Sequence, residues 1–256
     1  MARKKKRSSY SKSFFKIFFW LSVSSIAVYY TVYFFTEPPI VFYPGFQIEI
    51  PRGYKIHGID VSRYQKSINW KEVKNMEVKG IKIGFAFIKA TEGINRVDPQ
   101  FRRNWLKCEE QKITKGAYHF FIASRNGKRQ ASNFIEIVDL KKGDFPPVLD
   151  IEKTYGAPIN VIKKELADWL ETVEAHYGVR PIIYTNIDFY KNYLEHDFAE
   201  FPVWIAHYLE PNKPRLEHKW LFWQHSEAGR VNGILSPVDF NVFAGDSTEF
   251  NNFLIR

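Results

Sequence analysis

The sequence is poor in the residues that build disulfides and zinc sites. It has one cysteine, Cys108, in 256 residues, and it contains no H-x-H or H-E-x-x-H pattern. A single cysteine excludes an internal disulfide and every zinc site made from several cysteines. Four histidines fall near the ends of short β-rich runs without the close pairing typical of metal hydrolases: His57, His119, His207 and His225. We therefore predict no metal and no other cofactor, and we interpret Cys108 as a core residue.

Other functional patterns are also missing. The chain has no glycine-rich phosphate loop, no G-x-S-x-G nucleophile turn and no repeat of solenoid length. Its net charge is +9, but seven lysines and arginines precede the first acid, Glu37, which leaves about +2 on the rest. A nearly balanced body without a basic stripe predicts that nucleic acid is not a partner.

An uncharged apolar run stands near the N-terminus. Residues 17–35, IFFWLSVSSIAVYYTVYFF, would span about 29 Å as a helix, close to the thickness of a membrane core. A cleaved signal peptide remains an alternative, but the run lacks a small-residue cleavage site and ends in YFFTEPP. We therefore favour a single uncleaved anchor.

The flanks of this run predict the topology and the domain limits. The RKKKR cluster lies in a basic tail, residues 1–16, which we expect to stay in the cytoplasm. Residues 36–53 are rich in proline and glycine and read as a stalk or linker, and residues 54–256 form one domain. This domain is expected outside the cytoplasm, while residues 17–35 contact the membrane.

Short runs rich in Val, Ile, Phe and Tyr recur through the domain, each ending in polar groups. There are eight: KIHGID, IGFAFIKATEG, KGAYHFF, PPVLDIE, RPIIYTN, PVWIAHY, LFWQHS and VDFNVFA. Helix-like stretches separate the early runs at residues 99–112, 126–140 and 158–178, whereas after about residue 200 the helix-length gaps disappear. The pattern predicts an α/β protein, an irregular eight-stranded β/α barrel of the TIM type, with reduced helices and partly antiparallel strands in its C-terminal part.

Asp150 and Glu152 stand one residue apart at the end of the buried run PPVLDIE. Side chains at i and i+2 of a strand point to the same face, so both carboxyls would enter the mouth of the barrel. The more enclosed carboxyl holds its proton longer, which supplies a general acid beside an anion, as glycosidic cleavage requires. A solvated loop remains the alternative for an isolated D-x-E.

Further polar and aromatic residues fall at the same strand ends. Asp60 ends the first run and Asp239 begins the last, and in a closed barrel these strands are neighbours, so four acids can converge. Taken singly, Asp60 can also cap a helix and Asp239 can be a turn residue. Candidate sugar-contacting rings are Tyr64, Tyr118, Tyr184, Trp204 and Trp223. Gln224, in FWQHS, is a further candidate substrate-binding residue.

The ordered set HGIDVSRYQ, FAFIKATEG, GAYHFF, PVLDIE, PIIYTN, PVWIAHY, FWQHS and VDFNVF resembles glycoside hydrolase family 25, the Chalaropsis-type lysozymes, over about residues 55–246. The resemblance implies cleavage of the β-1,4 bond between N-acetylmuramic acid and N-acetylglucosamine in peptidoglycan glycan strands. It assigns the general acid to Glu152 and its partner carboxylate to Asp150. It also implies further site acids at Asp60 and Asp239, and substrate-facing rings at Tyr118 and Tyr184.

The leading hypothesis is therefore a membrane-anchored muramidase, and the resemblance implies that its domain acts in a bacterial cell envelope. Two alternatives stay open: a wall-binding module that no longer turns over substrate, and an anchored scaffold for protein partners of unknown identity. The sequence also leaves open whether the reaction retains or inverts the sugar configuration or uses the substrate's own acetamido group.

Overall fold

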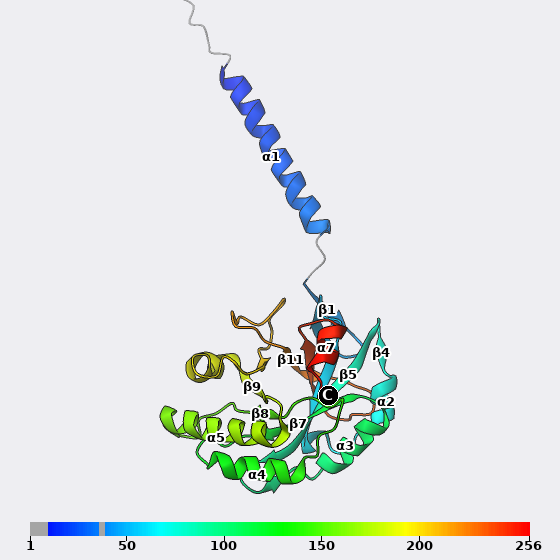
Figure 1. The fold of residues 1–256 in the computed structure, drawn as a ribbon. Helices are drawn as coiled ribbons and strands as arrows, with labels where there is room; N and C mark the ends of the chain where they lie inside the picture. Colours follow the sequence, from blue (N-terminus) through cyan, green and yellow to red (C-terminus); the bar gives the residue numbers. More distant parts are fainter. Residues whose placement is uncertain (1–9, 36–38) are drawn as a thin grey trace, which may run out of the picture. The chain divides into compact units, whose positions relative to one another are not determined.

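The computed structural model describes residues 10–35 and 39–256, so most of the predicted basic tail, residues 1–9, and residues 36–38 of the predicted stalk lie outside the described residues. The chain divides into two compact units, Met1–Pro39 and Ile40–Arg256. The first contains helix α1 (Tyr10–Phe35), drawn in blue in Figure 1. Its segment Phe14–Thr31 is long and apolar enough to cross a membrane, by length and composition. The hydroxyls of Ser22, Ser24 and Thr31 each donate to the carbonyl four residues earlier, which satisfies them within the helix.

The second unit contains the predicted eight-stranded barrel. Its strands are β3 (His57–Val61), β5 (Ile81–Glu92), β7 (Thr114–Phe120), β8 (Val148–Asp150), β9 (Ile182–Asn186), β10 (Val203–Ala206), β11 (Phe222–Gly229) and β12 (Val238–Phe243). They follow one another as β3-β12-β11-β10-β9-β8-β7-β5, and pairing of β3 with β5 closes the ring. Every predicted strand run overlaps one of these strands, so the predicted architecture is confirmed.

One strand of the ring runs against the others. β12 is antiparallel to both β11 and β3, while all the other neighbours in the ring are parallel. Residues 230–237 join β11 to β12, and so short a segment cannot hold the crossover helix that a parallel connection needs. The start of β12 therefore meets the same edge of the barrel as the ends of the other strands.

Helices cover one side of the barrel (Figure 1). The three predicted helices are present as α3 (Phe101–Glu110), α4 (Gly127–Ile137) and α5 (Ile159–Tyr177). The shorter elements are η1 (Arg63–Gln65), α2 (Trp70–Asn75), β4 (Glu77–Val78), β6 (Arg96–Val97), α6 (Ile187–Phe189), η2 (Tyr190–Leu194) and α7 (Ser247–Phe253). Within residues 39–256 no helix separates β10 from β11 or β11 from β12, as the spacing predicted.

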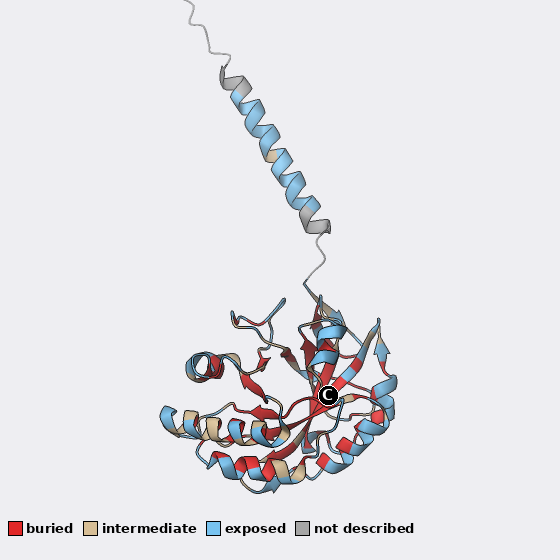
Figure 2. Cartoon of the chain, in the orientation of Figure 1, coloured by how far each residue is buried: buried red, intermediate tan, exposed pale blue. Residues whose placement is uncertain are grey.

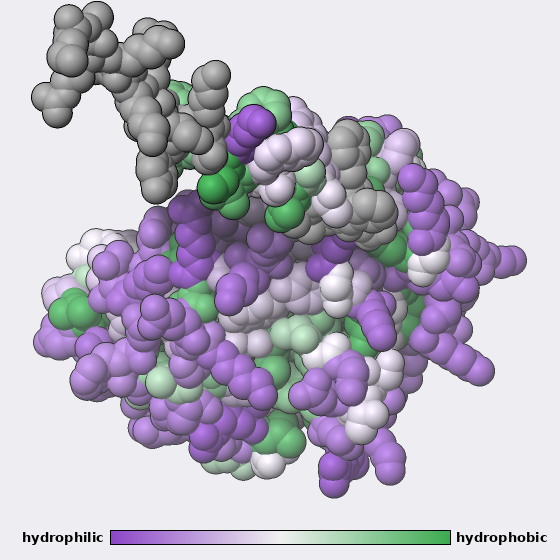
Figure 3. Space-filling view, turned by 90° about the horizontal axis from the view of Figure 1, so that it is seen from above, coloured by the Kyte–Doolittle hydropathy of each residue, from purple (hydrophilic) through white to green (hydrophobic). Residues whose placement is uncertain are grey.

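Aromatic side chains fill the inside of the barrel. Phe87 stacks on Trp204 with ring centroids 4.4 Å apart, and Phe145 packs edge-on against Phe222 below them. Gly116 allows this packing, because a Cβ there would lie 2.7 Å from the Phe87 ring. The strands form the buried centre of Figure 2. On the face in Figure 3, hydrophilic residues surround areas of mixed hydropathy and not one continuous apolar surface. The packed interior leaves the carboxyl ends of the strands as the open mouth.

Residues 40–51, within the segment expected to be a stalk, form a β hairpin of β1 (Ile40–Tyr43) and β2 (Ile48–Pro51). Its turn buries Phe46 completely, with the ring 5.0 Å from that of Phe240, and the Arg230 N–H donates to the Phe46 carbonyl. The proline and glycine content suggested an extended lead-in, but the alternating apolar residues of IEIP give the hairpin a buried face. This part of the segment is packed against the barrel.

Candidate active site

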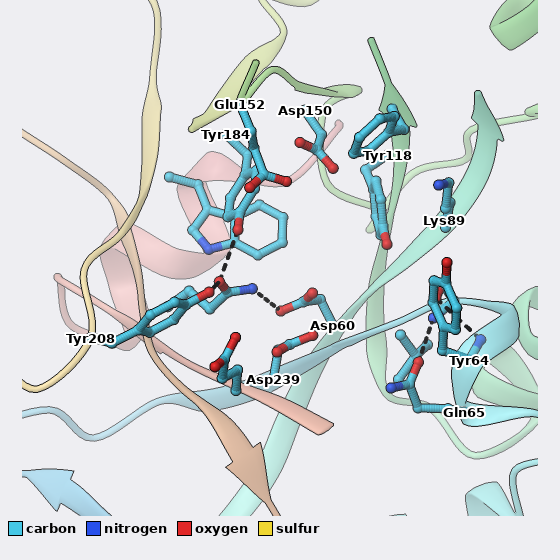
Figure 4. A pocket seen from close by; sticks show the side chains of 16 residues that line it. Asp60, Tyr64, Gln65, Lys89, Tyr118, Asp150, Glu152, Tyr184, Tyr208 and Asp239 are labelled. Carbon is cyan, nitrogen blue, oxygen red and sulfur yellow. Dashed lines mark hydrogen bonds between the residues drawn. The ribbon is translucent and has the colours of Figure 1, made fainter. Parts of the chain in front are cut away.

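A pocket at the carboxyl ends of the strands gathers the predicted acids (Figure 4). β3 supplies Asp60, β12 supplies Asp239, and the end of β8 supplies Asp150, with Glu152 just beyond it. The structure brings nine of the ten candidate site residues, all but Trp223, to this one pocket: Asp60, Tyr64, Tyr118, Asp150, Glu152, Tyr184, Trp204, Gln224 and Asp239.

Asp150 and Glu152 enter the pocket from the same side, while Ile151 between them is fully buried in the opposite direction. The strand alternation continues past the end of β8 because the Ile151 N–H donates to the Tyr184 carbonyl and the Asn186 amide reaches the Glu152 carbonyl at 3.4 Å. Asp150 is buried and Glu152 is half-buried. The two carboxyls therefore sit together, and the more enclosed one is Asp150. Enclosure alone thus does not single out Glu152 as the general acid, and that assignment comes from the family resemblance.

The Asp150 carboxyl is an unusual acceptor. Its Oδ1 is buried, and no described residue donates a hydrogen bond to it. Burial first, and then the charge of Glu152, hold the pKa of Asp150 well above its ordinary value. An N–H or O–H group of a ligand would supply the missing donor.

Asp60 and Asp239 face each other across neighbouring strands, since they are direct partners in the antiparallel register of β3 and β12. Asp60 Oδ1 accepts hydrogen bonds from Gln224 Nε2 at 2.8 Å and Asn241 Nδ2 at 2.7 Å. Burial raises the pKa of Asp60 despite these bonds. Burial, followed by the charge of Asp60, raises the pKa of Asp239 to about 9, so this pair retains a proton at neutral pH.

Gln224 connects this acid pair to the aromatic wall. Its Oε1 accepts hydrogen bonds from the hydroxyls of Tyr184 at 2.8 Å and Tyr208 at 2.6 Å, while its amide nitrogen donates to Asp60. Trp204 Nε1 donates to Asn241 at 2.8 Å, and Asn241 in turn donates to Asp60. These bonds hold the polar floor of the pocket in one geometry.

The aromatic candidates separate into three groups. Tyr118 and Tyr184 are buried in the wall, and Trp204, 1% exposed, forms the floor. Tyr64 stands at the rim and is 68% exposed. Trp223 does not line the pocket, because its side chain points outward from β11 and packs against Tyr54. Strand alternation explains the difference, since its neighbour Gln224 points inward.

Sequence reasoning missed several pocket residues: Lys89, Tyr208 and Glu227. Tyr208 carried a usable signal, because positions 204, 206 and 208 continue one face of β10 beyond its end. Glu227 carried none, because an irregularity in the pairing of β11 with β12 after Gln224 shifts the alternation there. Lys89 is the only cation among the described lining residues, against five acids.

The candidate histidines lie elsewhere. His57, His119 and His225 are buried, and burial lowers the pKa of each. His57 begins β3 and so lies at the end of the barrel away from the mouth, while His119 bonds to Thr91 at 2.7 Å. Among the residues that the structure describes, no group of three or more histidine, cysteine or acidic side chains can hold a metal ion.

A closed β/α barrel with clustered carboxyls and aromatic rings at its mouth is the arrangement of a barrel glycoside hydrolase. Residues 59–234 match the sequence profile of "Glycosyl hydrolases family 25". The chain belongs to this family and is a glycoside hydrolase.

Known relatives span most of the chain. The "Uncharacterized protein YegX" of Escherichia coli K12 is 43% identical over 93% of this chain and 85% of its own length. "Lysozyme M1" of Streptomyces globisporus is 33% identical over 75% of this chain and 69% of its own. Among solved structures, a family 25 glycosyl hydrolase of Bacillus anthracis is 36% identical with a TM-score of 0.72, covering 79% of this chain and 94% of that one. A lysozyme of Streptomyces coelicolor is 32% identical with a TM-score of 0.69, covering 77% and 96%.

Proposed function

We propose that the protein is a peptidoglycan muramidase that hydrolyses the β-1,4 bond between N-acetylmuramic acid and N-acetylglucosamine. The similarity to lysozymes of two Streptomyces species supports this substrate. The observation that carries the proposal is the pairing of a buried Asp150 with a half-buried Glu152 on one side of an acid-lined pocket.

Glu152 is the general acid in this proposal. It donates its proton to the glycosidic oxygen as the bond from that oxygen to the anomeric carbon breaks. Partial access to water allows the same carboxylate to take a proton from the incoming water in the second half of the reaction. As the glycosidic bond breaks, positive charge develops at the sugar. A pocket lined by five acids and one lysine stabilises this charge.

Asp150 is the orienting carboxylate. Its buried Oδ1 without a donor suits the N–H of the substrate's 2-acetamido group. Such a bond would turn the acetamido oxygen toward the anomeric carbon, where it forms a bond as the leaving group departs. Water then opens that intermediate. Asp60 and Asp239 position the sugar and tune this acid pair from across the pocket.

We also propose that α1 anchors the enzyme, with residues 1–16 in the cytoplasm and the barrel on the outer side of the membrane. The apolar segment Phe14–Thr31 and the basic residues before it support this topology. Protease accessibility of the barrel in intact spheroplasts tests it, and a barrel that becomes accessible only after lysis contradicts it.

The activity is tested with the full chain in detergent micelles and purified, defined muropeptide chains. Mass spectrometry of the products identifies the new reducing sugar, which is muramic acid for a muramidase and glucosamine for a glucosaminidase. Glu152→Gln should lower kcat by about 10²- to 10⁴-fold, the usual contribution of a general acid. Glu171→Gln, at an exposed site on α5, is the matched control. Equal rates for Glu152→Gln and wild type would remove Glu152 as the acid.

A further inference from the structure

A second groove lies at the carboxyl ends of β5 and β7. We call it the arginine groove: it is lined by residues 92–96, Ile122 and Arg125. Ile94 and Ile122 are half-buried and give it an apolar surface, while Arg96 and Arg125 are exposed. Its volume of about 330 Å³ is within the range of small-ligand sites.

The arginine groove adjoins the acid pocket through one carboxylate. Glu92 accepts from Lys89 Nζ at 2.8 Å on one oxygen and from Arg96 at 2.8 Å on the other. Lys89 lines the acid pocket, where its ammonium stands 4.4 Å from the centre of the Phe120 ring. The acid pocket and the arginine groove are therefore neighbours, with the Lys89–Glu92 ion pair between them.

The two sites have opposite charge. Among the described residues that line the arginine groove, Glu92 is the only acid, and Lys89 and Arg96 already neutralise it. The Arg125 guanidinium forms no hydrogen bond or ion pair with any residue in the described ranges. Lys128 and Arg129 follow it on the exposed first turn of α4, which has no acid. The arginine groove thus offers an available guanidinium beside apolar side chains, whereas the neighbouring pocket is acidic.

We infer that the arginine groove binds the peptide carried by the muramyl sugar, with Arg125 pairing to a carboxylate of that peptide and Ile94 and Ile122 contacting its aliphatic side chains. This inference rests on the proposed function. During cleavage the sugar becomes positively charged, which suits the acid pocket. The peptide attached to that sugar is negatively charged, which suits the arginine groove. Arg125 is a substrate-positioning residue in this arrangement and touches no reacting atom.

The test uses two preparations of the same peptide-bearing glycan chains, with all amines acetylated. In one the peptide carboxylates are intact, and in the other they are converted to carboxamides, which keeps the shape and removes the charge. The kcat/KM of the full chain in detergent micelles is measured on both. Arg96 is left intact because it also holds Glu92.

Wild type should prefer the carboxylate chains by about 3- to 10-fold, a modest factor because solvent screens an exposed guanidinium. Arg125→Ala should reduce the preference to about 1 through a higher KM, and Arg125→Lys should restore part of it. Lys142→Ala, which removes an exposed cation that lines neither the arginine groove nor the acid pocket, should keep the wild-type preference.

Two results would overturn this inference and leave the proposed function standing. One is efficient cleavage by wild type with no preference for carboxylate over carboxamide chains, and the other is an unchanged preference in Arg125→Ala. If wild type releases no muramic acid ends from either preparation, the proposed function fails and this inference falls with it. The two failures are therefore distinguishable in one experiment.

Discussion

Asp150→Asn should make the protein more stable and less active. Asp150 is 6% exposed, its Oδ1 has no donor among the described residues, and Glu152 lies beside it. An asparagine has nearly the same shape, carries no charge and can donate its amide hydrogens to Glu152. The substitution therefore removes a buried carboxyl that must take up a proton on folding, but leaves the packing of β8 intact.

The stability gain should depend on pH with a defined sign. Burial and Glu152 raise the pKa of Asp150 in the folded state, so the folded protein keeps a proton that the unfolded chain loses near pH 4. Wild-type stability therefore declines as the pH rises from about 4 toward the folded pKa, whereas asparagine has no such loss. The variant should gain about 1–2 kcal/mol at pH 7, or about 2–8 °C in Tm for a domain of this size, and almost nothing below pH 4.

The activity should fall by about 10²-fold or more in kcat, because an amide cannot ionise and so cannot stabilise the positive charge that develops at the sugar. Thermal unfolding from pH 3.5 to 8 and product release from glycan chains measure the two effects on the same samples. Asp139→Asn, at an exposed acid, is the control and should change neither. A destabilised Asp150→Asn at pH 7, or a gain in stability that does not grow with pH, would refute the argument that Asp150 is a strained, buried carboxyl.

Further predictions concern the supporting structure. Gln224→Leu should lower kcat/KM by about 10- to 100-fold on glycan chains, because it removes three hydrogen bonds of 2.6–2.8 Å in the pocket floor. An unchanged kcat/KM would mean that the pocket floor keeps its geometry without Gln224. Lys115→Ala should cost about 3–5 kcal/mol in urea unfolding, since it leaves the buried Asp144 carboxylate without its ion pair at 2.6 Å, and combining it with Asp144→Leu should recover most of that loss. Phe46→Ala should lower the free energy of unfolding by about 3–5 kcal/mol in the same assay, because it leaves a cavity against Phe240. An unchanged free energy of unfolding would mean that the hairpin only links the barrel to the preceding segment.

Much of the fold could be read from local pattern. Each of the eight β-rich runs overlaps a barrel strand, and the three long amphipathic stretches are helices within a few residues of the predicted limits. The hairpin at residues 40–51 was missed because its two strands have only four residues each, among prolines and a glycine. Its burial depends on contacts with β11 and Phe240, which are distant in the sequence.

Site residues could be predicted where side chains alternate regularly between the two faces of a strand. They could not be predicted where irregular pairing between strands disturbs that alternation. Asp150 and Glu152 share a side because Ile151 is buried on the other, a property of one short segment. Trp223 and Gln224 were both candidates, and only the direction of β11 in the barrel decides which of them faces inward. Glu227 enters the pocket through an irregular pairing that no local pattern predicts.

By itself, the sequence determined the apolar N-terminal helix, the strand and helix order, and the shared direction of the D-x-E acids, because each depends on neighbours along the chain. Only the tertiary structure decided that β12 runs antiparallel beside β3, which sets Asp239 opposite Asp60, and that Gln224 joins that pair to Tyr184 and Tyr208. The physical reason is that alternation fixes the face on which a side chain lies, whereas closure of the barrel fixes which faces meet.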